Sequence, residues 1–220
     1  MIYLYESDRL LFQGDSITHG GRGENQWDKN HVLGHGYQTL LAGRLLYDNR
    51  AHMPEIYNRG VSGDGTAKLA ARWDADTLAL RPTVLSLLIG VNDCYRPGDH
   101  KVRDYAAQLE ALLARTRAAL PEIKLILCEP FAFPAPGQSD ADAAPALESM
   151  AACAKEAKAA AERFGAVYVP FRSALAPFVD TGPPGSVIWD GVHPTALGHE
   201  IMARQWYETV DKSGLLRERG

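Results

Sequence analysis

The chain reads Val84-Leu85-Ser86-Leu87-Leu88-Ile89, followed at once by Gly90-Val91-Asn92-Asp93. A short, nearly continuous apolar run that ends at a glycine is typical of a strand buried on both faces, as in the middle of a parallel sheet. We therefore expect a central parallel strand here, with polar side chains just beyond its carboxyl end.

Strand and helix patterns alternate on both sides of this run. Further strands are expected at residues 9–12, 56–58, 123–128 and 166–169, and helices at 35–48, 67–79, 102–116, 144–164 and 196–210. Residues 134–145, rich in Pro, Ala and Asp, are expected to form a surface loop. This alternation predicts an α/β fold with a parallel sheet covered on both sides.

Length and composition indicate one ordinary globular domain spanning residues 1–220, with 46% hydrophobic and 23% charged residues. The net charge is −4 and no Lys/Arg stripe is present, which argues against a nucleic-acid partner. The sequence contains no run of about 18 apolar residues, so no membrane span is expected. Glu6, Asp8 and Arg9 interrupt the N-terminus too early for a signal peptide, so we expect a cytoplasmic protein.

Three cysteines, Cys94, Cys128 and Cys153, are widely spaced and form no CxxC pair. This odd count favours reduced thiols over a disulfide framework or a zinc site. Cys94 lies close to Asn92, but no activating partner is adjacent to it in sequence, so a catalytic thiol is not expected.

Ligands of open α/β sheets bind outside the carboxyl ends of the strands, which directs attention to four segments. Gly14-Asp15-Ser16-Ile17-Thr18 follows the first strand. Its glycine permits a sharp turn that exposes a nucleophilic hydroxyl on Ser16, and the following helix start offers free N–H donors. The same residues would also serve as a simple helix cap.

Two glycine-containing turns follow the next two strands. In the segment from Asn58 to Gly65, the N–H of Gly63 is a candidate oxyanion donor, although an ordinary turn fits as well. Ser62 matches a G-x-S-x-G elbow except for one residue, so we do not take it as the nucleophile. After the central strand, the Asn92 amide can donate into the same cleft or can form an Asx turn.

The fourth segment is Trp189-Asp190-Gly191-Val192-His193-Pro194. A carboxylate three residues before a histidine can accept the Nδ1 proton and leave Nε2 free to take a proton from Ser16. A loop histidine beside a surface aspartate is the alternative when the segment is taken alone.

These four segments, in this order, resemble those of the SGNH hydrolases, also called the GDSL esterase/lipase family, from Gly14 to about Tyr207. The resemblance implies a flavodoxin-like three-layer α/β/α sandwich and a serine esterase that needs no metal or cofactor. It also implies a triad of Ser16, Asp190 and His193, and an oxyanion hole formed by Ser16, Gly63 and Asn92.

A closer similarity is to the intracellular acetylxylan esterases of this superfamily. It rests on Leu69-Ala70-Ala71-Arg72-Trp73, Arg81-Pro82, the segments around Asn92 and His193, and Gly198-His199. It implies removal of acetyl groups from xylo-oligosaccharides by a homo-oligomer. The chain departs from the pattern at Tyr95 and in its 134–145 segment. Asp15, Tyr95 and Trp189 are the expected substrate-binding residues, because polar and aromatic groups suit sugars.

Other functions stay open from sequence. Within the family they are a lysophospholipase or a thioesterase, and outside catalysis a carbohydrate-binding protein. A nucleotide- or flavin-binding domain is disfavoured because Gly20, Gly21 and Gly23 do not fit G-x-G-x-x-G and no P-loop is present. A metal site at His31 and His35 is disfavoured because Gly34 lies between them and no acidic motif follows.

Overall fold

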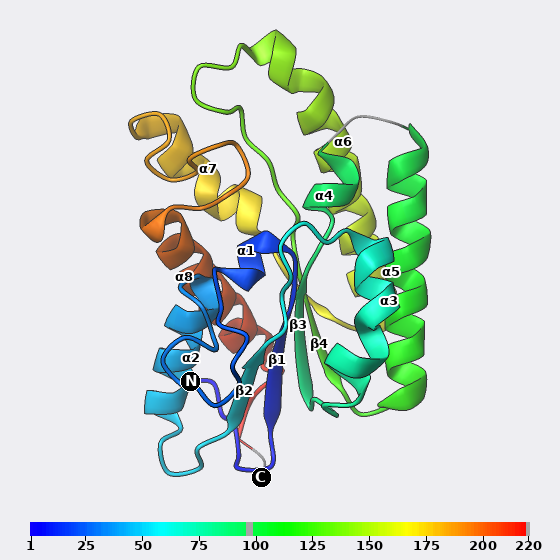
Figure 1. Ribbon diagram of the computed structural model, residues 1–220, viewed down its shortest axis with the longest axis vertical. Helices are drawn as coiled ribbons and strands as arrows, with labels where there is room; N and C mark the ends of the chain where they lie inside the picture. The colour runs from blue at the N-terminus through cyan, green and yellow to red at the C-terminus, as the bar shows by residue number, and fades with distance from the viewer. Residues whose placement is uncertain (96–98, 219–220) are drawn as a thin grey trace.

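The computed structural model describes residues 1–95 and 99–218 (Figure 1). Its described residues form a five-stranded sheet in the order β2-β1-β3-β4-β5, and all neighbouring strands are parallel. The strands are β1 (Arg9–Gly14), β2 (Glu55–Asn58), β3 (Val84–Leu88), β4 (Lys124–Cys128) and β5 (Val167–Val169). This is the flavodoxin-like strand order, so the predicted fold class is confirmed.

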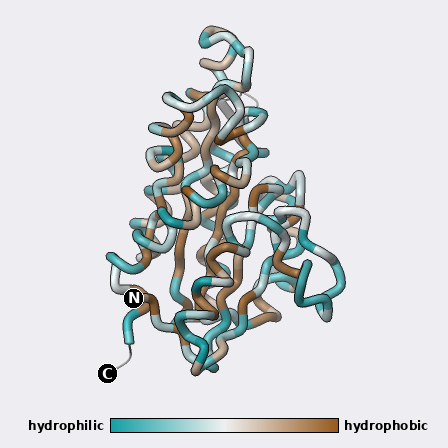
Figure 2. The backbone as a smooth tube through the Cα atoms, turned by 90° about the vertical axis from the view of Figure 1, so that its left-hand side faces the viewer, coloured by the Kyte–Doolittle hydropathy of each residue, from teal (hydrophilic) through white to brown (hydrophobic). Residues whose placement is uncertain are grey.

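The central position of β3 is also confirmed. All five of its residues are buried, and the strand pairs with β1 on one side and β4 on the other. Its single polar side chain, Ser86, accepts a hydrogen bond from the Trp206 indole at 3.0 Å, which satisfies both buried groups. In Figure 2, hydrophobic segments run through the interior of the molecule and the outer loops are mainly hydrophilic.

Helices cover both faces of the sheet and complete a three-layer sandwich (Figure 1). One layer contains α2 (Tyr37–Asp48), α7 (Phe171–Thr181) and α8 (Ala196–Ser213), and the other contains α3 (Thr66–Trp73), α5 (Asp99–Ala119) and α6 (Asp140–Phe164). The one-turn helices α1 (Ser16–His19) and α4 (Val91–Cys94) begin just after β1 and β3. Within the described ranges, no helix is long and apolar enough to cross a membrane.

Three local predictions differ from the structure. Helix α7 was not predicted, because Pro177 inside it is a helix-breaking signal. The predicted 134–145 loop is wrong from Asp140 onward, where α6 begins after Ser139 accepts a hydrogen bond from the Asp142 N–H. The predicted helix at 67–79 divides into α3 and the π-helical turn η1 (Asp74–Leu78).

The cysteine prediction is wrong for two of the three residues. A disulfide joins Cys94 of α4 to Cys153 of α6, whereas Cys128 is a buried free thiol whose pKa burial raises to about 12. The two partners are 59 residues apart in sequence and meet only because α4 and α6 pack together. The disulfide thus tethers the short helix that carries Asn92.

The end of β1 depends on the absence of a side chain at Gly14. A Cβ there would lie 2.2 Å from the Leu88 carbonyl oxygen and 2.7 Å from Thr18 Oγ1. We expect Gly14→Ala to lower the free energy of unfolding by more than about 3 kcal/mol in urea denaturation, because backbone atoms must shift.

Gly43→Ala is the matched control. Gly43 lies inside α2 and a new Cβ would have no atom within 4 Å, so this change should stabilise the protein by about 0.5–1 kcal/mol. Similar effects of the two substitutions would contradict the packing account.

Candidate active site

Ser16 lies at the turn between β1 and α1. The helix is capped by Asp15, whose Oδ1 accepts a hydrogen bond from the Ile17 N–H at 3.0 Å. Since Ser16 is the first residue of α1, its own N–H is among the donors that a helix start leaves without an intrahelical partner. The turn therefore presents a hydroxyl and a backbone donor from the same residue.

The structure brings Ser16, His193 and Asp190 together in one hydrogen-bonded chain. Ser16 Oγ lies 2.8 Å from His193 Nε2, and His193 Nδ1 lies 2.7 Å from Asp190 Oδ2. Because the carboxylate engages Nδ1, Nε2 is the nitrogen left to accept the serine proton. The predicted fold-back of Asp190 on the histidine three residues later is present.

Asp190 is also held by the backbone of its own loop. Its Oδ1 accepts hydrogen bonds from the N–H groups of His193 at 2.8 Å and Val192 at 3.1 Å. Partial burial acts to raise the pKa of Asp190, but the hydrogen bonds from His193 and Val192 outweigh it and lower that pKa below its usual value. The carboxylate therefore stays charged opposite the imidazole.

The shape of the loop is fixed by a left-handed glycine and by two backbone contacts. Gly191 has φ 97°, and its carbonyl accepts a hydrogen bond from the Phe133 N–H at 2.8 Å. Trp189 N–H donates to the His193 carbonyl at 3.0 Å, which closes the loop on itself. A side chain at Gly191 would meet the Phe133 carbonyl at 2.8 Å, so the loop needs a glycine here.

The three predicted oxyanion donors lie on loops that are bonded to one another. The Gly14 carbonyl accepts from the Val61 N–H at 3.0 Å, which joins the Ser16 turn to the loop of Gly63. Asn92 Nδ2 donates to the Asp64 carbonyl at 2.8 Å, which joins the third loop to the second. An amide has two N–H donors, and the bond to Asp64 uses one of those of Asn92.

Asp15, the first of the expected substrate-binding residues, is 0% exposed and lies beneath the Ser16 turn, a position that does not favour contact with substrate. Its Oδ1 caps α1, and its buried Oδ2 has no hydrogen-bond partner in the described part of the chain. Burial, the largest effect, raises the pKa of Asp15 to about 7. The carboxyl supports the turn of Ser16 from beneath.

The other two expected substrate-binding residues do lie beside the triad. Trp189 is 60% exposed and stacks on the His193 ring, with centroids 6.2 Å apart and an interplanar angle of 27°. Tyr95 is half-buried, and its hydroxyl lies next to Gly191. Contact of either residue with substrate stays a prediction.

Two groups around the site were not predicted from sequence. Asp93 accepts hydrogen bonds from the Thr66 N–H at 2.9 Å and the Thr66 hydroxyl at 2.7 Å, and so anchors the start of α3 beside Asn92. Arg72, noted in the sequence only as part of a similar segment, contacts two of the site loops. The i,i+4 spacing of Arg72 and Asp76 was the one signal available for it.

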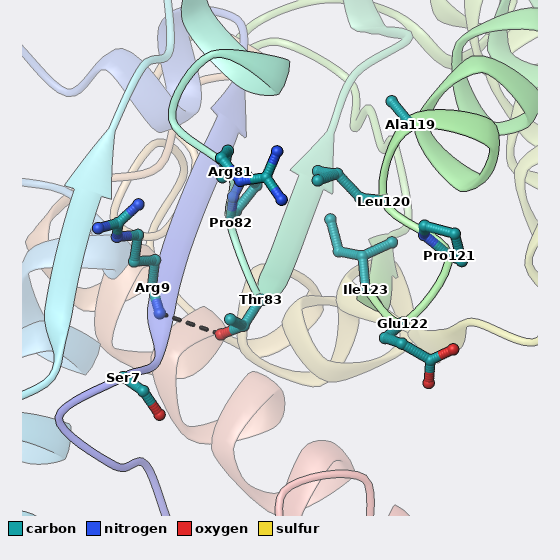
Figure 3. A pocket seen from close by; sticks show the side chains of 10 residues that line it. All are labelled: Ser7, Arg9, Arg81, Pro82, Thr83, Ala119, Leu120, Pro121, Glu122 and Ile123. Carbon is teal, nitrogen blue, oxygen red and sulfur yellow. Dashed lines mark hydrogen bonds between the residues drawn. The ribbon is translucent and has the colours of Figure 1, made fainter.

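A cavity of about 480 Å³ is lined by residues that precede β1, β3 and β4, away from the triad, and Figure 3 shows the side chains that line it. It lies beside the amino ends of β1 and β3, where Thr83 Oγ1 accepts a hydrogen bond from the Arg9 N–H at 3.0 Å.

Within residues 1–95 and 99–218, no group of three His, Cys, Asp or Glu side chains could hold a metal ion. His31 instead pairs with Asp28 at 2.7 Å.

Comparisons with known proteins agree with this geometry. Residues 12–201 match the GDSL-like lipase/acylhydrolase family. A curated acetylxylan esterase of Geobacillus stearothermophilus is 32% identical over 217 residues, covering 92% of this chain and 94% of that protein.

Solved structures of a GDSL-like lipase and of an acetylxylan esterase also superpose on this chain. A protein of Parabacteroides merdae, described as a GDSL-like lipase, superposes with a TM-score of 0.86 at 38% identity, covering 97% of this chain and 99% of that chain. The acetylxylan esterase Axe2 of Geobacillus stearothermophilus superposes with a TM-score of 0.82 at 29% identity, covering 98% and 99%.

Fold, site and relatives together define a carboxylic ester hydrolase. The chain belongs to the GDSL-like lipase/acylhydrolase family, which its sequence had indicated.

The burial of Asp15 makes stability depend on pH. Because its folded pKa of about 7 exceeds the usual aspartate value of 3.8, the folded state binds more protons between these values. The contribution of Asp15 to the free energy of unfolding therefore falls as the pH rises from about 4 to about 7. Above about pH 7 it falls no further. Asp15→Asn keeps the Oδ1 cap without a charge.

We expect the stability of Asp15→Asn, relative to the unsubstituted protein, to rise by several kcal/mol between pH 4 and pH 8 in urea denaturation, at about 1.4 kcal/mol per pKa unit. Asp180→Asn, at an exposed position on α7, is the control and should show no such trend. A pH-independent difference for Asp15→Asn would refute the assignment of a neutral, buried carboxyl.

Proposed function

We propose that this hydrolase removes short acyl groups, acetyl first among them, from carbohydrate, with xylo-oligosaccharides as the substrate class. The reaction proceeds through an acyl-enzyme on Ser16. The observation that carries the proposal is the chain from Ser16 Oγ to His193 Nε2 and from His193 Nδ1 to Asp190, with distances of 2.8 and 2.7 Å.

Acylation begins when Ser16 Oγ attacks the ester carbonyl carbon and its proton passes to His193 Nε2. The carbonyl oxygen becomes an oxyanion that accepts hydrogen bonds from the N–H groups of Ser16 and Gly63 and from the Asn92 amide. Asp190 stabilises the imidazolium without taking its proton. His193 then gives that proton to the leaving sugar oxygen as the carbon–oxygen bond breaks.

Deacylation repeats these steps with water as the nucleophile. His193 takes a proton from water, the hydroxide adds to the acyl carbon, and the same donors hold the second oxyanion. Breakage of the bond to Ser16 Oγ releases acetate, and the proton returns to the serine.

The acetyl and sugar assignments are supported by the surroundings of the triad and by the relatives. Trp189 beside His193 gives an exposed aromatic face, and Tyr95 adds a hydroxyl, a combination that suits a sugar better than a long acyl chain. Axe2 is described as an acetyl-xylooligosaccharide esterase, and its variants at one serine and one aspartate are described as catalytic mutants.

Two further proposals rest on the sequence resemblance. We infer a homo-oligomer in solution, which light scattering coupled to gel filtration would measure. We also infer a cytoplasmic location, which fractionation of the native host would test.

Ser16→Ala should lower kcat/KM for p-nitrophenyl acetate and for acetylated xylo-oligosaccharides by at least about 10⁴-fold, since the nucleophile is lost. The thermal midpoint should change by only a few degrees. Ser62→Ala is the matched control, because Ser62 is an exposed serine on a neighbouring loop and should keep its activity.

A panel with p-nitrophenyl octanoate, palmitoyl-CoA and lysophosphatidylcholine separates the alternatives. Turnover of the nitrophenyl acetate but not of the oligosaccharide would keep the esterase and remove the xylan assignment. Faster turnover of the long acyl substrates would replace it with a lysophospholipase or thioesterase. No Ser16-dependent turnover of any ester would favour a carbohydrate-binding role.

A further inference from the structure

Arg72 lies at the centre of the loops that carry the proposed oxyanion donors. Its side chain is only 18% exposed. The guanidinium donates to the Asp64 carboxylate at 2.7 Å and the Asp76 carboxylate at 3.1 Å. It also donates to two backbone carbonyls, that of Arg59 at 2.8 Å and that of Gly14 at 3.3 Å.

These acceptors belong to the segments that bear the donors. The Gly14 carbonyl lies two residues before Ser16, at the turn between β1 and α1. The Arg59 carbonyl and Asp64 bracket the loop that contains Gly63. The Arg72 side chain therefore bonds to both ends of the Gly63 loop and to the residue at which the Ser16 turn begins.

The third donor is reached through Asp64. The Asp64 side chain is only 8% exposed and is bound by Arg72, while the Asp64 backbone carbonyl accepts the hydrogen bond from Asn92 Nδ2 at 2.8 Å. The helix that carries Arg72 is in turn anchored at Thr66 by Asp93, the residue next to Asn92. Asn92 is therefore linked to Arg72 by two short routes.

Charge neutralisation alone does not explain this arrangement. Pairing with Asp64 and Asp76 uses Nε and Nη1, yet Nη2 and a second bond from Nη1 reach carbonyls on two different loops. A guanidinium has five donors in a rigid planar fork, so it can set the distance between several acceptors at once. A lysine ammonium supplies the charge without that geometry.

We propose that Arg72 is a positioning residue for the oxyanion hole: it fixes the Ser16 turn, the Gly63 loop and, through Asp64, the Asn92 amide relative to one another. This inference rests on the proposed function. It predicts that the guanidinium geometry, more than its charge, sustains the rate of acyl transfer.

The test compares Arg72→Lys with Arg115→Lys. Arg115 forms an exposed ion pair with Asp74 on η1, so its substitution changes the same chemical group on the surface of the same layer. Arg72→Lys should lower kcat for p-nitrophenyl acetate by about 10- to 100-fold, less than the full loss of one donor. KM should change by less than about threefold, and Arg115→Lys should change neither.

A double-mutant cycle with Asn92→Ala supplies a readout that a loss of stability would not move. If Arg72 acts through the Asn92 amide, the cost of Arg72→Lys in kcat should be clearly smaller in the Asn92→Ala background. Should Arg72→Lys fail to fold, Arg72→Met combined with Asp64→Asn removes both buried charges and enters the same cycle.

The outcomes separate the two proposals. Unchanged kcat in a folded Arg72 variant would overturn the role of Arg72 while Ser16-dependent hydrolysis stands. Effects that multiply fully with Asn92→Ala would overturn the part of that role that acts through the Asn92 amide. Activity that survives in Ser16→Ala would overturn the proposed function and this inference with it. A lower kcat, an unchanged KM and coupling to Asn92 support the positioning role.

Discussion

The parallel pairing of β1 with β3 is the constraint on which the site depends. It places Gly14 opposite Leu88 in register, so two chain segments separated by more than 70 residues end side by side. In this strand order the crevice at the β1/β3 boundary is the topological switch point, where the connections leave in opposite directions and a ligand can enter. The turn of Ser16 follows β1 and the loop of Asn92 follows β3, so both lie at this boundary.

Four carboxyl groups lie on the loops that carry the triad and the predicted oxyanion donors, and each is accommodated by a different interaction. Asp15 is buried with its pKa raised to about 7, and it supports the serine turn. Asp64 is paired with Arg72, and Asp93 binds the start of α3. Only Asp190 combines partial exposure with an imidazole partner. The environment, and not the residue type, therefore selects one aspartate to orient the histidine.

The parallel sheet and the loops that carry the triad were predictable from sequence, because apolar runs followed by polar residues mark strand ends and parallel strands end at the same edge. Features that depend on tertiary packing were not. The Cys94–Cys153 disulfide requires knowledge that α4 and α6 pack together. The burial of Asp15 follows from its capping geometry, and two of the acceptors of Arg72 are backbone carbonyls, which leave no trace in a sequence. Helix α7 was not predicted because Pro177 is a helix-breaking residue in sequence, whereas in the folded protein it lies inside that helix.

The proposed chemistry depends on one activated hydroxyl, that of Ser16. Intact-mass and peptide-mapping spectrometry after reaction with a p-nitrophenyl alkylphosphonate tests it most directly, because the reagent forms a stable adduct with an activated serine nucleophile. The account predicts one adduct per chain, located on Ser16 and strongly slowed in His193→Gln. An adduct on Ser62 or Cys128, labelling of Ser16 that persists without the histidine, or no adduct at all would contradict it.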